Sequence, residues 1–364
     1  MKVICYSPSI HTGGGTERVL VNLANELTNR GYIIEIFSQK IGEKIFYDLN
    51  KSIKVKQLLY DKIAQRFNHL ILFRIFNKIF GGLFLQIELD RTLKSELTAI
   101  ITFSNSIAIA CFRTSFRLKL IAFEHWPYWK AKKNIKLKYK IDTIYPKLCR
   151  VVVLTNSDKK NYESIGCNVV TIPNAYTYFP EIQSNLTSKN VLSIGHFNDQ
   201  KRRDLLIESW QYINNKYPDW TLSIIGDGKL EVECIQQINK LNLQNSIKII
   251  KPIKEIRSYY LNSSIFVLSS EFESFSLVLM EAKTFGIPCV SFDVETGPNE
   301  VIRDNIDGYL VPFGDCEKLA EKTCRLIDNY DLRKNMGIAG RLDALSKFDP
   351  VDIYNTWESL IRQF

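Results

Sequence analysis

Short runs of apolar residues alternate with longer amphipathic segments along both halves of the chain. Such runs, rich in Val, Ile and Leu and bounded by turn residues, are typical of buried strands in a parallel sheet. The strands predicted in the first half are Val3–Ser7, Ile33–Ser38, Ala99–Phe103, Leu120–Phe123, Val151–Thr155 and Val169–Ile172. Helical spacing over Thr16–Arg30, with Gly31 as the stop, predicts a helix between the first two strands. The chain therefore opens with a βαβ unit.

The same alternation restarts at residue 191. The predicted strands are Val191–Ile194, Leu222–Gly226, Ile247–Ile250, Ser264–Leu268 and Pro288–Phe292, and the predicted helices are Leu205–Lys216, Leu230–Leu241, Lys254–Leu261 and one that starts near Ser276. The polar stretch Glu181–Asn190 predicts an interdomain connection. We expect an α/β fold with two Rossmann-like doubly wound domains, residues 1–173 and 174–348, facing a central cleft. The final helix, residues 349–364, is expected to pack back on the first domain.

Size and cysteine content narrow the class of protein. The chain has 364 residues, which suits two domains of ordinary size. Its eight cysteines form no CxxC pair, and Cys5 and Cys289 lie within apolar runs. With no signal peptide evident, we expect reduced, mostly buried thiols in a cytoplasmic protein. No apolar run reaches the roughly 18 residues of a transmembrane helix.

Charge is distributed unevenly between the two halves. Residues 1–173 carry 27 Lys and Arg against 13 Asp and Glu, a net charge of +14, whereas the remainder carries −5. A basic half indicates a polyanionic partner, such as nucleic acid, anionic lipid or a phosphorylated substrate. Lys130–Lys140 is a lysine run, and Arg66–Leu89 mixes bulky apolar residues with Arg74 and Lys78. The second segment fits either an anionic membrane surface or a core helix with snorkelling cations.

Two carboxylates, Glu273 and Glu281, stand eight positions apart around the start of an apolar helix. The run Ser264–Ser270 upstream predicts a strand, and Gly286 ends the helix. A helix N-terminus after a strand is an anion site, because its free N–H groups and its dipole favour negative charge. With a helix start near Ser276, Glu281 lies roughly 7 Å further along the axis. One carboxylate can therefore lie on each side of a pyrophosphate and bind hydroxyls, which suits a nucleotide sugar.

Two motifs in the first half stand at the carboxyl ends of predicted strands. In the loop Thr12–Arg18, Gly14 and Gly15 let backbone N–H groups approach a phosphate or a sugar. The loop has no Walker lysine and is not GxGxxG, so an ATPase or dinucleotide site is disfavoured, and a tight turn without ligand is the alternative. His125, which follows the strand Leu120–Phe123, is placed either to contact a ligand or to bond its neighbours as a structural histidine.

Three loops in the second half carry candidate ligands for a nucleotide. Lys201, Arg202 and Arg203 are consecutive cations ahead of a helix, which can clamp a diphosphate or lie in a solvated turn. Gly226 ends the next predicted strand and can line a nucleotide pocket or only turn the chain. The segment Thr296–Glu300 predicts a turn that borders the same site.

Taken together, these segments resemble the family 4 glycosyltransferases of the GT-B type, which have two Rossmann domains. The resemblance covers almost the whole chain, and the matching elements occur in the family's order. They are the glycine loop, the Glu124-His125 pair, Ile172–Asn174, Ser193–Gly195 with Lys201, the Glu273–Glu281 element and Asn305–Val311. The Thr296–Glu300 loop also looks like that of bacterial O-antigen, capsule and lipopolysaccharide transferases.

The resemblance implies three catalytic residues, with His125 beside the transferred sugar, Glu273 on its hydroxyls and Lys201 on the diphosphate leaving group. The resemblance also implies that Glu281 binds the ribose. Backbone N–H groups at the start of the helix near Ser276 would hold the sugar and the phosphates. The candidate substrate-binding residues are Gly14, Gly15, Arg202, Gly226, Phe275, Ser276, Leu277, Val278 and Glu281. The family often has arginine where this chain has His196, which is only partly charged near neutral pH.

The family resemblance also implies a metal-independent, cofactor-free reaction that retains anomeric configuration, in which cations and a helix dipole take the place of Mg²⁺. We expect a hexosyltransferase that moves a sugar from a nucleotide diphosphate sugar, UDP-linked, to a lipid-linked saccharide or lipopolysaccharide acceptor. The basic first domain should meet an anionic membrane surface, with the protein peripheral on the inner face of the cytoplasmic membrane and no nucleic acid bound.

Three alternatives stay open at this point. A sugar-nucleotide epimerase on the same fold would consume the donor without an acceptor. A nucleic-acid-binding protein fits the isoelectric point of about 9.0, although the chain has no recognition motif. A non-catalytic membrane scaffold would bind lipid but no donor.

Overall fold

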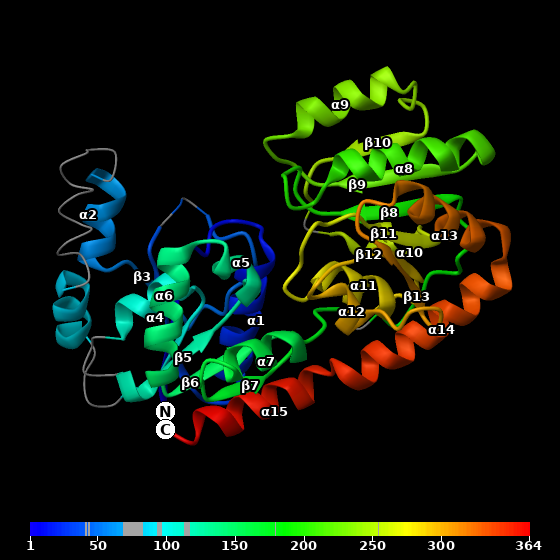
Figure 1. Ribbon diagram of the computed structural model, residues 1–364. Coiled ribbons are helices and arrows are strands. Elements are labelled where there is room, and N and C mark those ends of the chain that lie inside the picture. The colour runs from blue at the N-terminus through cyan, green and yellow to red at the C-terminus, as the bar shows by residue number, and fades with distance from the viewer. Residues whose placement is uncertain are drawn as a thin grey trace. The chain divides into compact units, whose positions relative to one another are not determined.

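The computed structural model describes residues 1–40, 42, 44–67, 83–92, 97–112, 117–178, 180–253 and 255–364. The chain divides into two compact units (Figure 1). Unit 1 comprises Met1–Asn174 together with Val351–Phe364, and unit 2 comprises Ala175–Pro350. The division falls one residue after the boundary expected from the sequence.

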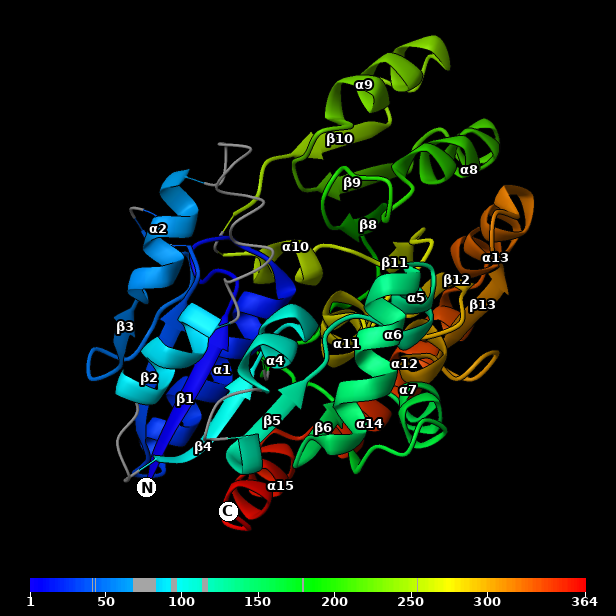
Figure 2. The same cartoon turned by 60° about the vertical axis from the view of Figure 1, so that its left-hand side comes forward.

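Unit 1 is built on a parallel sheet of seven strands in the order β3-β2-β1-β4-β5-β6-β7 (Figure 2). Their bounds are β1 (Lys2–Ser7), β2 (Ile33–Ser38), β3 (Lys54–Lys56), β4 (Leu97–Thr102), β5 (Leu120–Phe123), β6 (Arg150–Val153) and β7 (Val169–Thr171). The strand order reverses between β1 and β4, and the loops that leave such a point diverge and open a crevice at the carboxyl ends of the strands. The glycine loop follows β1, and His125 follows β5.

In the described part of unit 1, α-helices lie between these strands and at the C-terminal end of the chain. They are α1 (Gly15–Asn29), α2 (Leu59–Phe67), α4 (Asn105–Cys111), α5 (Tyr128–Lys132), α6 (Ile135–Ile144), α7 (Asn156–Glu163) and the C-terminal α15 (Pro350–Ile361), and residues 83–92 are also helical. The α15 helix packs on unit 1, with the Trp357 ring 4.9 Å from that of Phe123 and Glu358 bonded to Arg30. The amphipathic segment predicted over Arg66–Leu89 lies largely outside the described residues.

Unit 2 contains a second parallel sheet, of six strands in the order β10-β9-β8-β11-β12-β13. Its strands are β8 (Asn190–Ile194), β9 (Thr221–Ile225), β10 (Ile247–Ile250), β11 (Ile265–Leu268), β12 (Cys289–Asp293) and β13 (Gly308–Pro312). Its helices are α8 (Arg203–Lys216), α9 (Glu231–Lys240), α10 (Arg257–Leu261), α11 (Leu277–Thr284), α12 (Pro298–Val301), α13 (Cys316–Asp328) and α14 (Tyr330–Lys347). The order reverses between β8 and β11, so the loops after these two strands are expected to line a ligand site.

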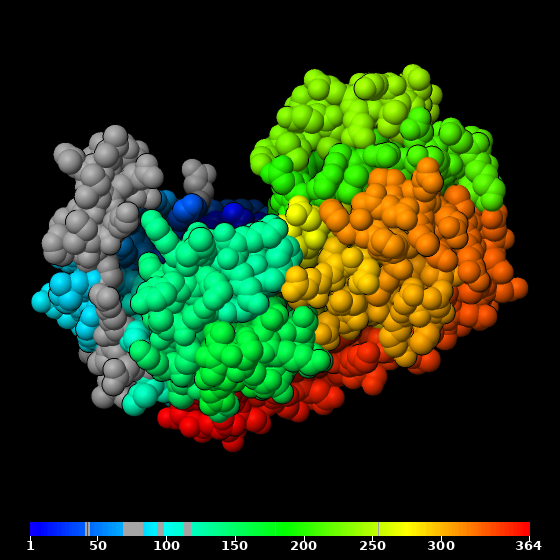
Figure 3. Space-filling view, viewed as in Figure 1, coloured from blue at the N-terminus to red at the C-terminus, as the bar shows by residue number. Residues whose placement is uncertain are grey.

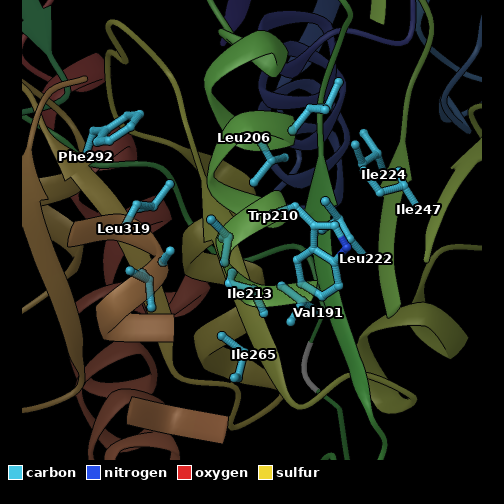
Figure 4. Close-up of a cluster of buried hydrophobic side chains, with 14 of the residues drawn as sticks. Val191, Leu206, Trp210, Ile213, Leu222, Ile224, Ile247, Ile265, Phe292 and Leu319 are labelled. Carbon is cyan, nitrogen blue, oxygen red and sulfur yellow. The ribbon is translucent and has the colours of Figure 1, made fainter. Parts of the chain in front are cut away.

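The core of unit 2 is an apolar cluster between the sheet and its helices (Figure 4). Trp210 of α8 lies at its centre and packs near Val191 and Leu222 of the sheet. The indole Nε1–H of Trp210 donates a hydrogen bond of 3.1 Å to Ser246 Oγ, so its one polar group is satisfied inside the core. This packing holds the strand ends, and therefore the loops that follow them, in fixed positions.

The prediction that Glu181–Asn190 connects the domains is wrong, because this stretch packs on unit 2. The Ser184 hydroxyl donates to the Ser263 carbonyl at 2.7 Å, and its N–H donates to the Phe285 carbonyl at 3.0 Å. The guanidinium of Arg333 donates to the carbonyl of Leu186, which is buried. Most polar side chains of this stretch are exposed, so its composition resembles that of a solvated linker, but Ser184 and Leu186 are buried against unit 2.

All eight cysteines are free thiols, and Cys5 and Cys289 are buried as expected. Burial raises the pKa of the Cys5 thiol to about 12, so this thiol stays protonated and unreactive. Within the ranges that the structure describes, no helix is both long and apolar enough to cross a membrane.

Candidate functional site

The helix that carries Glu281 begins and ends where its sequence predicts. Ser276 is the N-cap of α11 and has left-handed backbone angles, with φ 73° and ψ 80°. At the other end Gly286 has φ +75°, which suits glycine because it has no Cβ. Its N–H donates to the Lys283 carbonyl at 2.9 Å, and the next N–H, of Ile287, donates to Ala282 at 3.0 Å. These two bonds form a Schellman C-cap, so α11 presents a defined N-terminus to the loop that holds Glu273.

Lys201 and Glu273 form an ion pair at the carboxyl ends of two neighbouring strands. Lys201 follows β8 and Glu273 follows β11, and these strands are paired in the sheet. The Lys201 Nζ lies 2.6 Å from Glu273 Oε1, and the Ser270 hydroxyl donates to the same oxygen at 2.7 Å. Both charged side chains are largely buried. The structure therefore brings together two of the three residues expected to be catalytic, and adds Ser270, which sequence reasoning missed although it stands at the end of a predicted strand.

The loop after β12 holds the backbone of Glu273 in place. The Thr296 hydroxyl donates to the Glu273 carbonyl at 2.6 Å. Gly297 has φ +97°, and a Cβ at this position would lie 2.6 Å from the Cβ of Glu273. Only glycine fits both the backbone angle and the close approach. The Thr296–Glu300 segment thus lies beside Glu273, and part of it forms the short helix α12 where a turn was expected.

The three consecutive cations do not converge on one site. Arg202 has φ +43° and makes a bidentate pair with Asp204, with an Nη2–Oδ2 distance of 2.7 Å. Arg203 is 2% exposed, and its guanidinium donates to Ser193 Oγ at 2.6 Å and to the Gly195 carbonyl at 2.9 Å. Burial lowers the pKa of Arg203 to about 10. The interpretation of Arg203 as a diphosphate ligand is therefore wrong, because this side chain supports the loop from inside and Lys201 is the cation that meets Glu273.

Gly226 and His196 lie in the same pair of loops. A Cβ at Gly226 would lie 2.2 Å from the Gly195 carbonyl oxygen, so glycine is needed for the two loops to pack together. His196 Nδ1 lies 3.1 Å from Asp227 Oδ1, and both side chains are about half exposed. The structure therefore gives Gly226 a packing contact, and it places His196 beside an acidic partner at the surface.

Glu281 lies inside unit 2, with an exposed fraction of 1%. The hydroxyl of Tyr260 on α10 donates to its Oε2 at 2.8 Å, and the Tyr260 ring stacks on Phe285 at 4.9 Å. Glu273 and Glu281 thus have different partners, Lys201 and Tyr260. Sequence reasoning did not single out Tyr260, because nothing in the local pattern links α10 to α11.

The four residues at the start of α11 differ in exposure. Phe275 is buried, with its ring 5.2 Å from that of Phe348, whereas Leu277 and Val278 are partly buried. The Ser276 side chain is also buried, and its hydroxyl has no hydrogen-bond partner among the described residues. A buried polar group without a partner is costly, and one at a helix N-terminus is available to a ligand.

In unit 1 the glycine loop is tied to a neighbouring loop. Gly14 is the N-cap of α1, and Gly15 is its first residue. The Tyr47 hydroxyl donates to the carbonyl of Gly13 at 2.8 Å and lies 3.2 Å from that of Gly14. The carbonyl of Gly14 also accepts from the N–H of Arg18 at 3.1 Å. These bonds to the carbonyls of Gly13 and Gly14 tie the loop to Tyr47 and to the first turn of α1.

His125 lines a cavity of about 470 Å³ in unit 1. Its ring stacks on Phe103 at 5.5 Å and lies 4.2 Å from Phe123. Burial lowers the pKa of His125 to about 3, so the imidazole is neutral at neutral pH. The walls also include Trp126 and Lys130, which the sequence-based site lacked. A neutral ring can exchange hydrogen bonds with a hydroxyl but brings no positive charge.

The carboxyl of Glu124 is buried beside this cavity. The Tyr145 hydroxyl donates to Glu124 Oε1 at 2.5 Å. Burial raises the pKa of Glu124 to about 7, with a smaller contribution in the same direction from the charge of Asp158. The Glu124-His125 pair therefore consists of two adjacent residues whose charged forms are both disfavoured by burial.

Comparison with known proteins supplies the family. Residues 176–343 match the family described as glycosyl transferases group 1, and residues 13–177 match Glycosyltransferase Family 4. The amylovoran biosynthesis glycosyltransferase AmsD of Erwinia amylovora is 28% identical, with 99% of each chain covered. An α-1,4-N-acetyl-D-galactosaminyltransferase of Campylobacter jejuni, whose name specifies a diNAcBac-PP-undecaprenol-linked substrate, is 28% identical over 96% of this chain and 95% of that one.

Solved structures agree in fold. A mutant of TarM from S. aureus, in complex with fondaparinux, α-GlcNAc-glycerol and UDP, has a TM-score of 0.79 at 16% sequence identity, with 99% of each chain covered. At this identity the likeness concerns the fold alone. The two family matches together run from residue 13 to residue 343, and they agree with the two parallel-sheet units described above. The chain therefore belongs to the family 4 glycosyltransferases and has their GT-B fold, with two Rossmann-like domains.

Proposed function

We propose that this glycosyltransferase moves a hexose-type sugar, with retention of configuration, from UDP to a lipid-linked saccharide in the assembly of a bacterial surface polysaccharide. The observation that carries the donor half of this proposal is the ion pair between Lys201 and Glu273 beside the N-terminus of α11. In this pair a cation suited to phosphate and a carboxylate suited to sugar hydroxyls already lie together.

Groups of the bound donor would take the place of the contact that Lys201 and Glu273 make with each other. Lys201 would turn from Glu273 to the diphosphate, and Glu273 would accept hydrogen bonds from sugar hydroxyls. The unpartnered hydroxyl of Ser276 and the free N–H groups of the first turn of α11 would bind phosphate oxygens. A carboxylate has about four acceptor sites. Glu281 could therefore bind a ribose hydroxyl while it keeps its bond to Tyr260.

Chemistry at this site would not need a metal or a cofactor. Negative charge builds on the leaving diphosphate in the transition state, and Lys201 together with the α11 dipole would stabilise it. The donor phosphate itself would accept the proton of the attacking hydroxyl from the same face. His125, being neutral, would bind a sugar hydroxyl and would not act as a cation.

Three comparisons support the identity of the substrates. The TarM structure contains UDP, and the Campylobacter relative is named for an undecaprenol-linked substrate. The Erwinia relative is named for amylovoran biosynthesis. We propose, by analogy, a UDP-sugar donor, and an O-antigen, capsule or lipopolysaccharide precursor as the acceptor. The enzyme would act as a peripheral protein on the inner face of the cytoplasmic membrane, where the net charge of +14 in residues 1–173 favours anionic lipid.

Slow hydrolysis of the donor tests this proposal without knowledge of the acceptor. The protein is incubated with a panel of nucleotide sugars, and the free nucleotide diphosphate is measured by mass spectrometry. We expect one UDP-sugar to be consumed, and Lys201→Ala to reduce its turnover by at least tenfold. Lys229→Ala is the matched control, because Lys229 is an exposed lysine of the same unit that pairs with Asp199.

Two results would contradict the proposal. One is the absence of both hydrolysis and thermal stabilisation with every nucleotide tested. The other is conversion of the donor alone to an epimeric nucleotide sugar, detected by NMR, which would identify an epimerase.

A further inference from the structure

The segment that contains α5 and α6 carries an unusual concentration of positive charge. Residues 126–140 hold six lysines and no acidic residue. In Figure 3 this segment, coloured blue-green, lies at the surface of unit 1. Its outward residues are Lys132, Lys133, Ile135, Lys136, Tyr139 and Lys140, all of them exposed, and they are called the α5–α6 face below.

Apolar side chains lie on both sides of α6. On the inner side Ile141 is fully buried in the core, and Leu137 packs partly buried against the same cluster. On the outer side Ile135 is 82% exposed and Tyr139 is 70% exposed, one helical turn apart. A surface helix of a globular protein normally turns its polar residues outward. Ile135 and Tyr139 are not the most unusual feature by exposure alone, since other apolar side chains are also exposed, but they are surrounded by the lysines of the α5–α6 face.

The lysines of this face are largely available to a partner. Lys138, which is not on the face, pairs with Asp142. Lys133 Nζ lies 4.8 Å from the Trp129 ring, a cation–π distance that leaves its charge uncompensated. In the part of the chain that the structure describes, Lys136 and Lys140 make no ion pair.

Lysines around exposed Ile and Tyr match the chemistry of an anionic bilayer. Lysine ammonium groups are attracted to the negative surface potential, while aliphatic side chains enter the acyl boundary and tyrosine rings favour the headgroup level. Nucleic acid would use the lysines and could stack on Tyr139, but it offers no apolar region for Ile135. The combination therefore favours lipid over nucleic acid.

We propose that the α5–α6 face docks on an anionic lipid bilayer, with Ile135 and Tyr139 inserted at the interface and the lysines on the headgroups. The docking face rests on the proposed function, because a lipid-linked acceptor is what brings the enzyme to a membrane. The other side of the same segment contributes Lys130, Ala131 and Leu137 to the wall of the His125 cavity. Docking through this face holds that cavity beside the bilayer, where the head group of a lipid-linked saccharide can enter while its lipid tail stays in the membrane.

Vesicle co-sedimentation of the full-length protein tests the docking face. The probes are neutral phosphatidylcholine vesicles and vesicles with added phosphatidylglycerol, each at low and high salt. We expect binding to the anionic vesicles that weakens with salt. The double variant Lys136→Gln, Lys140→Gln should reduce the partition coefficient about 25-fold, because each lysine near the surface contributes a factor of about five. Ile135→Ser should reduce it roughly tenfold at unchanged charge.

Lys51→Gln with Lys54→Gln is the matched control, because both lysines are exposed and precede or belong to β3 at the opposite edge of the sheet from β7. This control should bind vesicles within about twofold of wild type. Donor hydrolysis in the absence of vesicles should be the same in all variants, so loss of docking is distinguished from loss of the donor site.

Three outcomes would overturn the proposal: equal binding to neutral and anionic vesicles, equal loss in the β3 control, or vesicle binding unaffected by Ile135→Ser. A fourth measurement adds single-stranded RNA as competitor. RNA that binds more tightly than anionic vesicles, through the same lysines and without Ile135, would also overturn it.

Discussion

Lys201 Nζ and Glu273 Oε1 lie 2.6 Å apart, so the candidate phosphate ligand and the candidate sugar ligand of this glycosyltransferase neutralise each other. They lie on loops that follow adjacent strands, 72 positions apart in the sequence. The pair is largely buried, and each charge would be costly there without the other. A donor with both a phosphate and sugar hydroxyls can satisfy Lys201 and Glu273 at once. A ligand with only a phosphate, or only hydroxyls, leaves one of the two charged side chains without a partner.

Glu273→Gln should separate nucleotide binding from sugar transfer. The amide cannot pair with Lys201, so the cation becomes more available to phosphate, and the affinity for UDP should be unchanged or higher. Turnover of the UDP-sugar should fall by at least tenfold, because the sugar hydroxyls lose an anionic acceptor. Calorimetric titration of UDP and the donor-hydrolysis rate check the two halves. A parallel loss of UDP affinity would show that Glu273 acts on the nucleotide and not on the sugar.

Gly297→Ala should disturb Glu273 as well as the backbone. Alanine at a positive φ costs about 1 kcal/mol of stability, and here its Cβ would also lie 2.6 Å from the Cβ of Glu273. Gly314→Ala is the matched control, since Gly314 has φ +84° and a Cβ there meets nothing within 4 Å. We expect both variants to lower the urea midpoint, and Gly297→Ala alone to lower donor turnover. Equal turnover in the two variants would show that the Gly297 contact does not position Glu273.

Tyr260→Phe should destabilise unit 2 through Glu281. The substitution keeps the ring that stacks on Phe285 but removes the hydroxyl that donates to Glu281, leaving a buried acceptor without that bond. We expect a loss of about 1–3 kcal/mol in the free energy of unfolding, measured by urea titration. Tyr212→Phe is the control, because Tyr212 is exposed and its bond to Glu317 is long, at 3.4 Å. A weaker affinity for UDP in Tyr260→Phe would connect Glu281 to the ribose, and an unchanged affinity would assign it to the core.

The stability of unit 1 should depend on pH through Glu124 and His125, whose contributions change with pH in opposite directions. The pKa of Glu124 is about 7 in the folded chain against an ordinary value of 4.5, so its protonated form favours folding and stability falls as pH rises from 4.5 to 7. The pKa of His125 is about 3 against 6.5, so the unfolded chain binds the proton and stability falls as pH drops from 6.5 to 3. The two slopes oppose each other between pH 4.5 and 6.5.

Glu124→Gln should remove the contribution of Glu124, so that the pH dependence of stability between pH 4.5 and 6.5 reflects His125 alone. We expect unit 1 to lose up to about 1.4 kcal/mol per pH unit as pH falls from 6.5 to 4.5, whereas wild type changes little. Hydrogen exchange at the amides of β5, followed by mass spectrometry, reports on this unit. If the variant is as insensitive to pH as wild type, the His125 ring is not held neutral by burial.

Several features followed from local sequence alone. The start of α11 near Ser276, its end at Gly286 and the burial of Cys5 depend on helix capping and on apolar runs, which act over a few residues. Composition also marked the glycine loop and Gly226, and a Cβ at Gly226 would lie 2.2 Å from the Gly195 carbonyl oxygen. Each of these features depends on a local backbone angle or on the pattern of apolar residues over a few positions.

The sequence by itself determined two series of alternating strands and helices, and it put the candidate ligands at the carboxyl ends of strands. Only the tertiary structure decided which of them meet. It paired Lys201 with Glu273 and turned Arg203 into the loop, and it buried Lys283 of α11 against Asp307 and Asp343, at 3.2 and 2.8 Å. The reason is that such partners are set by the order of the strands and by the packing of helices such as α11 and α14, which bring distant segments together. No local period in the sequence encodes that arrangement.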